Sequence, residues 1–362
     1  MDIKRIIVLG ALFGDEGKGV CVNTLCQQAI KNNQKPLVVR FTGGPQAAHT
    51  VWHNGIMHVF SSFGSATMQN VPTLYNNTAL IDPICIVNEL NVLKSKGFNP
   101  IYNFSDGLII TPYDVDFCRN DKKTLADGTC GKGVYASLVR SQSGVGFRLN
   151  DNPDIILDKC AKYYNTERCD NFDQMFTNAL NFIRQTQTDI DETNFDTIIY
   201  EGTQGLLLDA DLGFVPNVTA TNTGLQYLSE NKLQNADVYL VMRTYLTRHG
   251  NGYMPKQIPD YNLDDKSETN VYNGYQGNFK TGIFDFDLLN EALKRHKLDS
   301  YKNTKFYIYL THLDTVKRNG KFIYIKNGTI CEESFIDYEQ IKQIYFNNIN
   351  INISELYTRD IK

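Results

Sequence analysis

The sequence lacks the features of membrane, exported and polybasic proteins. No stretch approaches the roughly 18–20 consecutive apolar residues of a membrane-spanning helix, and the apolar run at Ile6–Leu9 is too short for the core of a signal peptide. Basic and acidic residues nearly balance, at 36 against 40, for a net charge of −4. A dedicated nucleic-acid binder carries a basic excess. We therefore expect a cytoplasmic protein that has neither a nucleic acid nor a membrane as its partner.

Cysteine and histidine motifs are also missing. None of the eight cysteines forms a C-x-x-C pair, and the six histidines form no H-E-x-x-H or similar metal grouping. In a long chain without an export signal, such cysteines are expected to be reduced thiols. We therefore expect neither a disulfide framework nor a metal centre built from these residues.

The hydrophobic pattern alternates between strands and helices, and 362 residues are enough to bury a substantial core. Strands are predicted at Arg5–Gly10, Pro36–Phe41, Leu108–Thr111, Asp196–Tyr200, Ala236–Met242 and Lys305–Leu310. Helices are predicted at Val20–Lys31, Ile86–Lys96, Phe172–Thr188, Phe284–His296 and Tyr338–Phe346. This alternation predicts an α/β protein with a large, mostly parallel central sheet flanked by helices.

Glycine and polar residues mark the turns and loops between these elements. Hairpin turns are predicted at Asn54-Gly55 and Asn319-Gly320. The polar segment Asn251–Gln276 is predicted to be a long surface loop. Because the chain shows neither an internal repeat nor a linker, we expect a single domain over residues 1–362.

The first glycine-rich loop, Gly14–Gly19 (GDEGKG), lies between a predicted buried strand and a predicted helix. Its backbone amides can approach phosphate oxygens, a helix N-terminus favours negative charge, and Lys18 adds a donor. It is not a P-loop, because Leu12 stands where the first glycine is required and Gly19 where Ser or Thr would hold magnesium. Asp15 is unusual here, since a carboxylate repels phosphate unless a metal intervenes or the carboxylate acts as a base.

Three further polar loops carry glycines, and most of them follow predicted strands. They are Arg40–Thr50 (RFTGGPQAAHT), Gly128–Gly133 (GTCGKG), and Glu201–Gly205 (EGTQG) with the downstream Pro216–Asn222. Open α/β sheets bind ligands at the carboxyl ends of their strands. The loops therefore predict a site there for more than one phosphorylated ligand.

The strings GDEGKG, RFTGGPQAAHT, EGTQGLLLDADLG-x-x-P-x-VT and LTHLD resemble those of adenylosuccinate synthetases in order and separation. The resemblance runs from about Ile6 to Val316. It implies a ligase of purine nucleotide biosynthesis that joins L-aspartate to IMP with GTP and Mg²⁺. The products would be adenylosuccinate, GDP and phosphate, formed through a 6-phosphoryl-IMP intermediate. The resemblance further implies a homodimer.

The same resemblance implies catalytic and metal-binding roles. Asp15 would take the proton from N1 of the base and bind Mg²⁺, and the backbone carbonyl of Ala48 would be a second oxygen ligand. His49 would stabilise charge on the transferred phosphoryl group. Gln204 would belong both to the catalytic set and to the IMP site.

The resemblance also implies two nucleotide sites. The triphosphate site would comprise Gly14, Glu16, Gly17, Lys18, Gly19, His312 and Asp314. In it, His312 would stack on guanine and Asp314 would read its N1–H and 2-amino group. The IMP site would comprise Gln46, Thr129, Cys130, Arg140, Gln204 and Thr219. Cys130 would line that pocket without acting as a nucleophile, and Arg140 would reach the nucleotide of the partner subunit.

Two departures from the family pattern concern specificity. The segment Gly277–Gly282 (GNFKTG) keeps one cation, Lys280, where the family has a run of arginines. A lysine, with one charged nitrogen, binds a carboxylate less well than an arginine, whose guanidinium can donate two parallel hydrogen bonds to it. The expected aspartate site is therefore Lys280, Thr281 and Arg248, unless another amine replaces aspartate. The late glycine-rich segment that closes the family's guanine site is missing after Val316, which would loosen the choice between GTP and ATP.

Two alternatives stay open beside the reaction of IMP with GTP. A viral branch of the family joins aspartate to dGMP. Its members resemble this chain in overall shortness and in the short segment Gly133–Ala136. If the chain belongs to that branch, we expect it in the host cytoplasm. The retained Asp15 and Asp314 favour IMP and GTP over dGMP and ATP. The second alternative is a catalytically reduced nucleotide-binding protein, favoured by the missing arginines.

Overall fold

The computed structural model of the chain describes residues 3–128, 130–255, 258, 260–263, 268, 274–275 and 277–359. At its centre lies an eight-stranded sheet in which every neighbouring pair of strands is parallel. The strand order is β16-β13-β10-β1-β9-β2-β5-β7. The strands are β1 (Lys4–Gly10), β2 (Pro36–Arg40), β5 (Thr73–Tyr75), β7 (Tyr102–Phe104), β9 (Thr197–Gly205), β10 (Asp237–Arg243), β13 (Lys305–Thr311) and β16 (Ile353–Arg359). The predicted parallel α/β architecture is confirmed.

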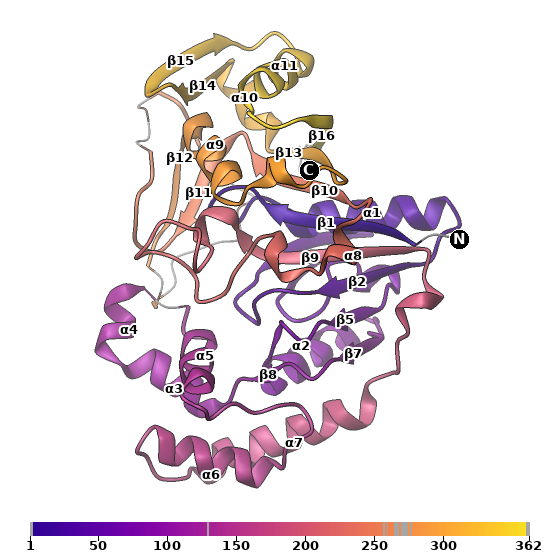
Figure 1. Cartoon of the computed structure of the whole chain (residues 1–362), viewed down its shortest axis with the longest axis vertical. Helices are drawn as coiled ribbons and strands as arrows, with labels where there is room; N and C mark the ends of the chain where they lie inside the picture. The colour runs from indigo at the N-terminus through magenta and orange to yellow at the C-terminus, as the bar shows by residue number, and fades with distance from the viewer. Residues whose placement is uncertain are drawn as a thin grey trace.

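The middle strands are buried on both faces, which explains why their sequences are almost continuously apolar. In β1, residues Ile6–Leu9 are at most 3% exposed, and β9 and β10 are buried in the same way. One apolar cluster joins this sheet to α9 and α11, and another joins it to α1 on the other face. Figure 1 shows α9 and α11 in the upper part of the view and α1 beside β1.

The long predicted helices are present, but several short ones were missed. The predicted helices are α1 (Lys18–Lys31), α2 (Pro83–Ser95), α7 (Asp170–Thr186), α9 (Phe286–Arg295) and α11 (Tyr338–Asn348). The missed helices are α3 (Pro112–Asn120), α4 (Lys122–Asp127), α5 (Val134–Gln142), α6 (Pro153–Tyr163), α8 (Glu230–Leu233) and α10 (Leu313–Asn319). Side-chain caps start three of them, α3, α4 and α6, and at α3 Thr111 and Asp114 form a capping box. Figure 1 shows α3–α7 gathered at the end of the molecule opposite β14 and β15.

Smaller sheets and short turns complete the architecture. A four-stranded sheet contains β11 (Tyr245–His249), β12 (Phe279–Asp285), β14 (Lys321–Lys326) and β15 (Thr329–Ser334). The two-stranded sheets are β3 (His49–His53) with β4 (Ile56–Phe60) and β6 (Leu80–Ile81) with β8 (Leu108–Ile109). Single 3₁₀ turns are η1 (Thr67–Gln69), η2 (Glu192–Asn194), η3 (Leu206–Leu208), η4 (Leu225–Tyr227) and η5 (Leu298–Ser300).

The local turn predictions have mixed outcomes. The hairpin at Asn54-Gly55 is confirmed, and both residues have positive φ. The hairpin predicted at Asn319-Gly320 is wrong, because Gly320 is the left-handed C-cap of α10. The chain turns instead at Asn327-Gly328, between β14 and β15. Both sites have the same dipeptide, which serves either as a helix stop or as a hairpin turn.

Two predicted elements have different boundaries or neighbours. The strand predicted at Leu108–Thr111 pairs with β6 and not with the central sheet. The helix predicted from Phe284 begins only at Phe286, because Asp285 caps it by accepting the amides of Asp287 and Leu288. Much of the segment predicted as the loop Asn251–Gln276 lies outside the described residues.

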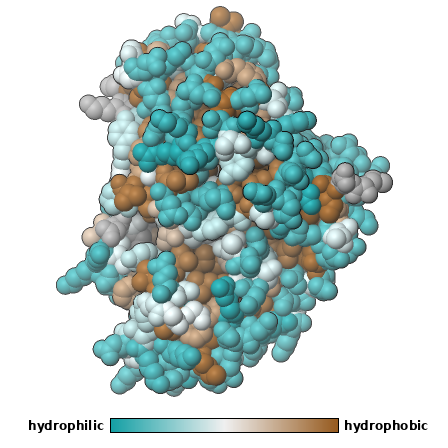
Figure 2. Space-filling model, in the orientation of Figure 1, coloured by the Kyte–Doolittle hydropathy of each residue, from teal (hydrophilic) through white to brown (hydrophobic). Residues whose placement is uncertain are grey.

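Among the described residues, every helix is too short or too polar to cross a bilayer. The face shown in Figure 2 is mainly hydrophilic, and apolar residues occur on it as patches between polar ones.

Arg140 lies in the interior of the protomer, which corrects its expected role at a partner's nucleotide. The side chain is 0% exposed, and its guanidinium bonds both carboxylate oxygens of Asp114, at 2.8 and 2.9 Å. It also donates to the carbonyls of Ile109 and Val145. A guanidinium that is fully enclosed in this way joins α5 to α3 and cannot extend to another subunit.

Replacing Arg140 by Met should therefore destabilise the fold strongly. The change leaves the buried carboxylate of Asp114 without its cation, which costs about 3–5 kcal/mol of unfolding free energy. Urea denaturation would measure the loss. The matched control is Lys162→Met, which removes an exposed ion pair with Asp158 and should cost at most about 1 kcal/mol. Equal effects in the two variants would contradict the structural role of Arg140.

Candidate active site

The first glycine-rich loop is braced by its own carboxylate. Glu16 turns back so that Oε1 accepts hydrogen bonds from the amides of Leu12 (2.8 Å) and Gly14 (3.0 Å). Its Oε2 atom pairs with Lys18 Nζ at 3.2 Å, and both side chains are buried. Gly10 makes room for this pair, because a Cβ atom there would lie 2.8 Å from Lys18 Nζ. The carboxylate of Glu16 thus shapes the loop, so only its backbone amide is left for the predicted triphosphate site.

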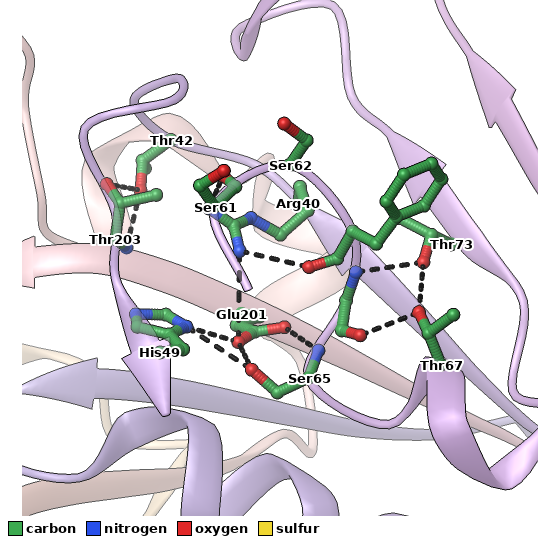
Figure 3. Close-up of polar contacts among 12 residues, drawn as sticks. Arg40, Thr42, His49, Ser61, Ser62, Ser65, Thr67, Thr73, Glu201 and Thr203 are labelled. Atoms are coloured by element: carbon green, nitrogen blue, oxygen red, sulfur yellow. Dashed lines mark hydrogen bonds and ion pairs between the residues drawn. The ribbon is translucent and has the colours of Figure 1, made fainter. Parts of the chain in front are cut away.

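His49 is fixed by a buried carboxylate from the neighbouring strand, as Figure 3 shows. Its Nδ1 atom lies 2.5 Å from Oε1 of Glu201, which is fully buried in β9. Ser65 donates its backbone amide, at 3.0 Å, and its hydroxyl to the same carboxylate. Arg40 Nη1 lies 3.9 Å from Glu201 Oε1. These four residues form one buried polar group, which we call the Glu201 cluster.

The charges within the Glu201 cluster favour an ionised carboxylate and a neutral imidazole. Burial alone would raise the pKa of Glu201, but the hydrogen bond from His49, the charge of Arg40 and the hydrogen bond from Ser65 hold it at about 2. Burial lowers the pKa of His49 and outweighs the opposing effect of Glu201. Because an ionised carboxylate can only accept, the proton of His49 lies on Nδ1. Nε2 has no hydrogen-bond partner among the described residues and is the ring nitrogen left for a ligand.

Three loops that are distant in sequence meet around His49. The start of α1 packs so closely that a Cβ atom on Gly19 would lie 2.7 Å from His49 Cβ. A Cβ atom on Gly205, at the end of β9, would lie 2.5 Å from the amide nitrogen of Gly14. Glycine is therefore required at both contacts, because any larger residue would push the loops apart.

Two glutamines lie beside these contacts. Gln204 Oε1 lies 3.7 Å from the position that a Cβ atom on Gly14 would occupy. Gln46 Oε1 accepts the amide of Gly44 at 2.8 Å, while its Nε2 is buried without a partner in the described part of the chain. A buried N–H group without an acceptor is costly. A bound carbonyl or phosphate oxygen would satisfy it.

Asp15 adopts a backbone conformation that is uncommon for residues other than glycine. Its φ angle is 58°, and such outliers gather at functional sites. The side chain is 22% exposed, and Nε2 of His249 lies 3.9 Å from Asp15 Oδ2. Ala48 is exposed in the second loop.

The oxygens of Asp15 and Ala48 fit a magnesium ion by their chemistry. Mg²⁺ prefers oxygen ligands and usually keeps waters and substrate phosphates among them. Within the described ranges, no group of three or more His, Cys, Asp and Glu residues could hold a metal by itself. A carboxylate and a carbonyl here would therefore need the oxygens of a bound nucleotide to complete a site.

The residues expected to bind aspartate lie on two paired antiparallel strands. Arg248 of β11 stands opposite Lys280 of β12, so both side chains lie on one face of the pair. Arg248 is 1% exposed, stacks on the ring of Phe13 at 4.3 Å, and donates to the carbonyls of Asn217 and Tyr253. Burial lowers its pKa to about 10. Lys280, which is half-buried, is thus the more accessible of the two cations.

The residues expected to read guanine differ in accessibility. His312 is 3% exposed, its Nδ1 atom lies 2.9 Å from Thr311 Oγ1, and its ring meets Tyr245 edge-on. The imidazole is therefore packed inside the protein, and its role in stacking on a base stays a prediction. Asp314 lies in the first turn of α10 with 42% of its side chain exposed, 3.4 Å from Arg318.

The remaining expected residues of the IMP site are Thr129, Cys130 and Thr219. Thr129 lies outside the described residues. Cys130 is partly buried, and burial raises the pKa of its thiol, so it is a poor nucleophile. The amide of Thr219 donates to the carbonyl of Leu208 at 2.8 Å, which ties its segment to the end of β9.

Several residues of the site were not predicted from the sequence. Glu201 was part of the quoted EGTQG string, but that string was expected to form a loop after the strand. β9 instead runs on to Gly205, so Glu201 lies inside the sheet, beside β2. Its signal was a single carboxylate at the end of an otherwise apolar strand. Ser65, Arg243 and His249 carried no distinctive motif.

Comparisons with known families agree over most of the chain. A family model described as adenylosuccinate synthetase matches residues 7–347. The adenylosuccinate synthetase of Francisella tularensis subsp. tularensis (strain SCHU S4) is 26% identical over 401 residues, covering 99% of this chain and 90% of the relative. The enzyme of Francisella philomiragia is also 26% identical, over 397 residues.

Solved structures share the fold. Fully ligated adenylosuccinate synthetase from Plasmodium falciparum superposes with a TM-score of 0.71 at 21% identity, covering 92% of this chain and 84% of that one. The succinoaminodeoxyadenylate synthetase of cyanophage S-2L, bound to dGMP and dATP, has a TM-score of 0.62 at 15% identity. That match covers 96% of this chain and 100% of the phage chain.

Gly19→Ala tests the close approach of α1 to the Glu201 cluster. The new methyl group would lie 2.7 Å from His49 Cβ, and such overpacking costs about 1–3 kcal/mol. Alanine regains up to about 1 kcal/mol of helix propensity, so we expect a net loss of about 1–2 kcal/mol in urea denaturation. Gly274→Ala, where the methyl group would meet nothing within 4 Å, should change stability by less than about 0.5 kcal/mol. If Gly19→Ala had the same free energy of unfolding as the wild-type protein, the close contact between α1 and His49 would be refuted.

Proposed function

Because the chain belongs to the adenylosuccinate synthetase family, a family of ligases that form a carbon–nitrogen bond, we propose that it joins L-aspartate to IMP at the expense of GTP. The products are adenylosuccinate, GDP and phosphate. The observation that carries the proposal is the Glu201 cluster, which leaves one nitrogen of His49 unpaired beside the first glycine-rich loop. A protein that only binds nucleotides has no chemical need for an oriented imidazole at that position.

The reaction begins with activation of the purine oxygen. O6 of IMP is a poor leaving group, so it must first become a phosphate ester. Asp15 takes the proton from N1, O6 gains negative charge and attacks the γ-phosphorus of GTP, and GDP departs. The amine of aspartate then attacks C6, and O6 leaves with phosphate. Positioning and charge stabilisation account for most of the acceleration in such transfers.

His49 stabilises the phosphoryl group during this transfer. Glu201 holds Nδ1, so the ring presents Nε2 in a fixed direction. A negatively charged phosphoryl oxygen at Nε2 favours the imidazolium, in which both ring nitrogens are donors. Glu201 thus compensates the charge that His49 takes up, and Ser65 and Arg40 keep Glu201 ionised.

Magnesium belongs to this proposal as the cofactor. When bound, the ion would neutralise charge on the triphosphate and the departing phosphoryl group. Asp15 and the carbonyl of Ala48 would hold it together with substrate oxygens. Asp314, the loop amides from Gly14 to Gly19 and Lys18 would bind the GTP, and Gln46, Thr129, Cys130, Gln204 and Thr219 would bind IMP.

The amino-acid site is reduced relative to the family pattern. We assign the carboxylates of aspartate to Lys280 and Thr281, with Arg248 as the supporting cation. Arg248 is already bonded to two carbonyls, so it contributes mainly through its charge. A homodimer remains part of the proposal, but without Arg140 as the residue exchanged between subunits.

A second candidate is the reaction of dGMP with aspartate and ATP. The likeness to the cyanophage enzyme, whose whole length is matched, favours it, as does the absence of an exposed aromatic face at His312. The carboxylates of Asp15 and Asp314 favour IMP and GTP, because Asp15 occupies space that a 2-amino group would need and Asp314 suits guanine.

Phosphate release from the purified protein would test both reactions. We expect release from GTP only when Mg²⁺, IMP and aspartate are all present, and little release when dGMP replaces IMP. Faster release with dGMP and ATP would replace the first reaction by the second. No release with either acceptor, combined with measurable nucleotide binding, would leave a catalytically reduced binding protein.

Variants of two carboxylates would test the assigned roles. Asp15→Asn removes the base and should lower kcat about 10²- to 10⁴-fold while IMP still binds. Glu201→Gln keeps the shape of the cluster but not its charge, and should lower kcat about 10- to 100-fold with little change in KM. Both effects would appear in steady-state phosphate release.

The matched control is Glu89→Gln. Glu89 is another buried carboxylate that bonds a histidine, His58, and the Ser61–Phe63 segment, but it lies on α2 outside the glycine-rich loops. Its replacement should lower stability and leave kcat within about 2-fold, since it acts on no reacting group. If Glu201→Gln retained full kcat, or if Glu89→Gln lost as much, the positioning of His49 by Glu201 would be refuted.

A further inference from the structure

Three consecutive carbonyls of the first glycine-rich loop are held from outside the loop. Thr247 Oγ1 donates to the carbonyl of Gly14 at 2.8 Å, and Arg243 Nε donates to the carbonyl of Asp15 at 2.6 Å. Thr311 Oγ1 donates to the carbonyl of Glu16 at 2.9 Å. Arg243 and Thr311 are the last residues of the paired strands β10 and β13, and Thr247 is the middle residue of β11.

This arrangement fixes where the loop amides point. A trans peptide directs its N–H opposite to its C=O. When the carbonyls of Gly14, Asp15 and Glu16 face the strands, the amides of the next residues, up to Gly17, face away from them. None of these amides donates to an acceptor within the described ranges, and the N-cap of α1 has no capping side chain. Successive free amides of this kind form a concave site for an anion.

The loop would not keep this conformation unaided. The φ angles of Gly14, Asp15 and Gly17 are 93°, 58° and 100°. For Asp15 the left-handed region is strained, so surrounding contacts must hold it there. The hydrogen bond from Arg243 acts on the carbonyl of that same residue.

Arg243 is itself rigidly placed. It is 5% exposed, and its Nη1 atom lies 2.7 Å from the hydroxyl of Tyr245 and 2.8 Å from Glu268 Oε2. Its Cζ atom lies over the ring of Phe279, 5.9 Å from the centroid. A guanidinium can make these bonds and still direct Nε to Asp15. A lysine has a single side-chain nitrogen and cannot bond Tyr245, Glu268 and the carbonyl of Asp15 in the same arrangement.

We propose that Arg243, Thr247 and Thr311 form a carbonyl clamp that presets the loop amides for the triphosphate of the nucleotide, with Arg243 as a positioning residue for Asp15. The inference rests on the proposed function for the identity of the ligand. The clamp itself is a property of the free protein. It stabilises the loop before a ligand arrives, so binding costs less ordering of the backbone.

The clamp can be tested without turnover. The variants are Arg243→Lys, Thr247→Val and Thr311→Val, and the control is Thr304→Val, which removes a hydroxyl that donates to the carbonyl of Leu233 at 3.0 Å, away from the loop. Inorganic tripolyphosphate with Mg²⁺ serves as the probe, because it has no base and reports on the phosphate subsite alone. Hydrogen exchange followed by mass spectrometry reports on the amides of residues 11–20 in the free protein.

Each clamp variant should weaken tripolyphosphate binding about 5- to 10-fold, the effect of losing one hydrogen bond of about 1 kcal/mol. Exchange of the loop amides should accelerate by a similar factor, while Thr304→Val leaves both unchanged. Unaltered binding and exchange in Thr247→Val and Thr311→Val would overturn the clamp, even if Arg243→Lys proves too unstable to purify. A variant that lowers thermal stability but leaves both readouts unchanged would show a purely structural role and would also overturn it.

Different experimental results would refute the proposed function and the proposed clamp. If the wild-type protein binds tripolyphosphate but releases no phosphate with either acceptor, the proposed reaction fails and the clamp is still decided by binding and exchange. If the wild-type protein does not bind tripolyphosphate, the clamp is overturned. If turnover is normal in the clamp variants with unchanged KM for GTP, the reaction stands and the clamp is rejected.

Discussion

The buried carboxylate of Glu201 is the interaction on which the geometry of the site depends. It lies inside the parallel sheet, where an ion without partners would be costly, and His49, Ser65 and Arg40 converge on it from other segments. The hydrogen bonds and the ion pair that stabilise this one charge hold the second loop against the sheet. The same contact brings His49 against the start of α1, where only Gly19 fits.

The proposed chemistry uses two groups that make no close hydrogen bond within the described residues. Glu16 and Lys18 neutralise each other within the first loop, and Glu201 occupies Nδ1 of His49. Asp15, partly exposed, and Nε2 of His49 are left for a ligand. A carboxylate and an imidazole on adjoining loops suit the proposed activation of a purine oxygen, and the family membership of the chain supplies the class of reaction.

Periodicity in the sequence predicted the parallel sheet and its long helices, because these elements depend on burial patterns that a sequence displays directly. It did not predict short helices such as α4 or the strand β16, whose residues become ordered only against the rest of the fold. Motifs predicted the glycine-rich loops, but not the direction of individual side chains. Glu16, Arg140 and His312 were assigned to ligands, although contacts within the loop turn the Glu16 side chain inward and contacts with other elements bury the side chains of Arg140 and His312. Glu201 and Arg243 were missed because their importance arises from partners distant in the sequence.

In the proposed reaction, the purine oxygen is phosphorylated and then leaves with that phosphate. Turnover of IMP labelled with ¹⁸O at O6, in the presence of aspartate, GTP and Mg²⁺, tests it most directly. Mass spectrometry of the released phosphate should find one ¹⁸O atom per turnover, and the same transfer is expected from labelled dGMP if that is the true acceptor. Phosphate free of ¹⁸O, formed at the same rate as product, would contradict the account.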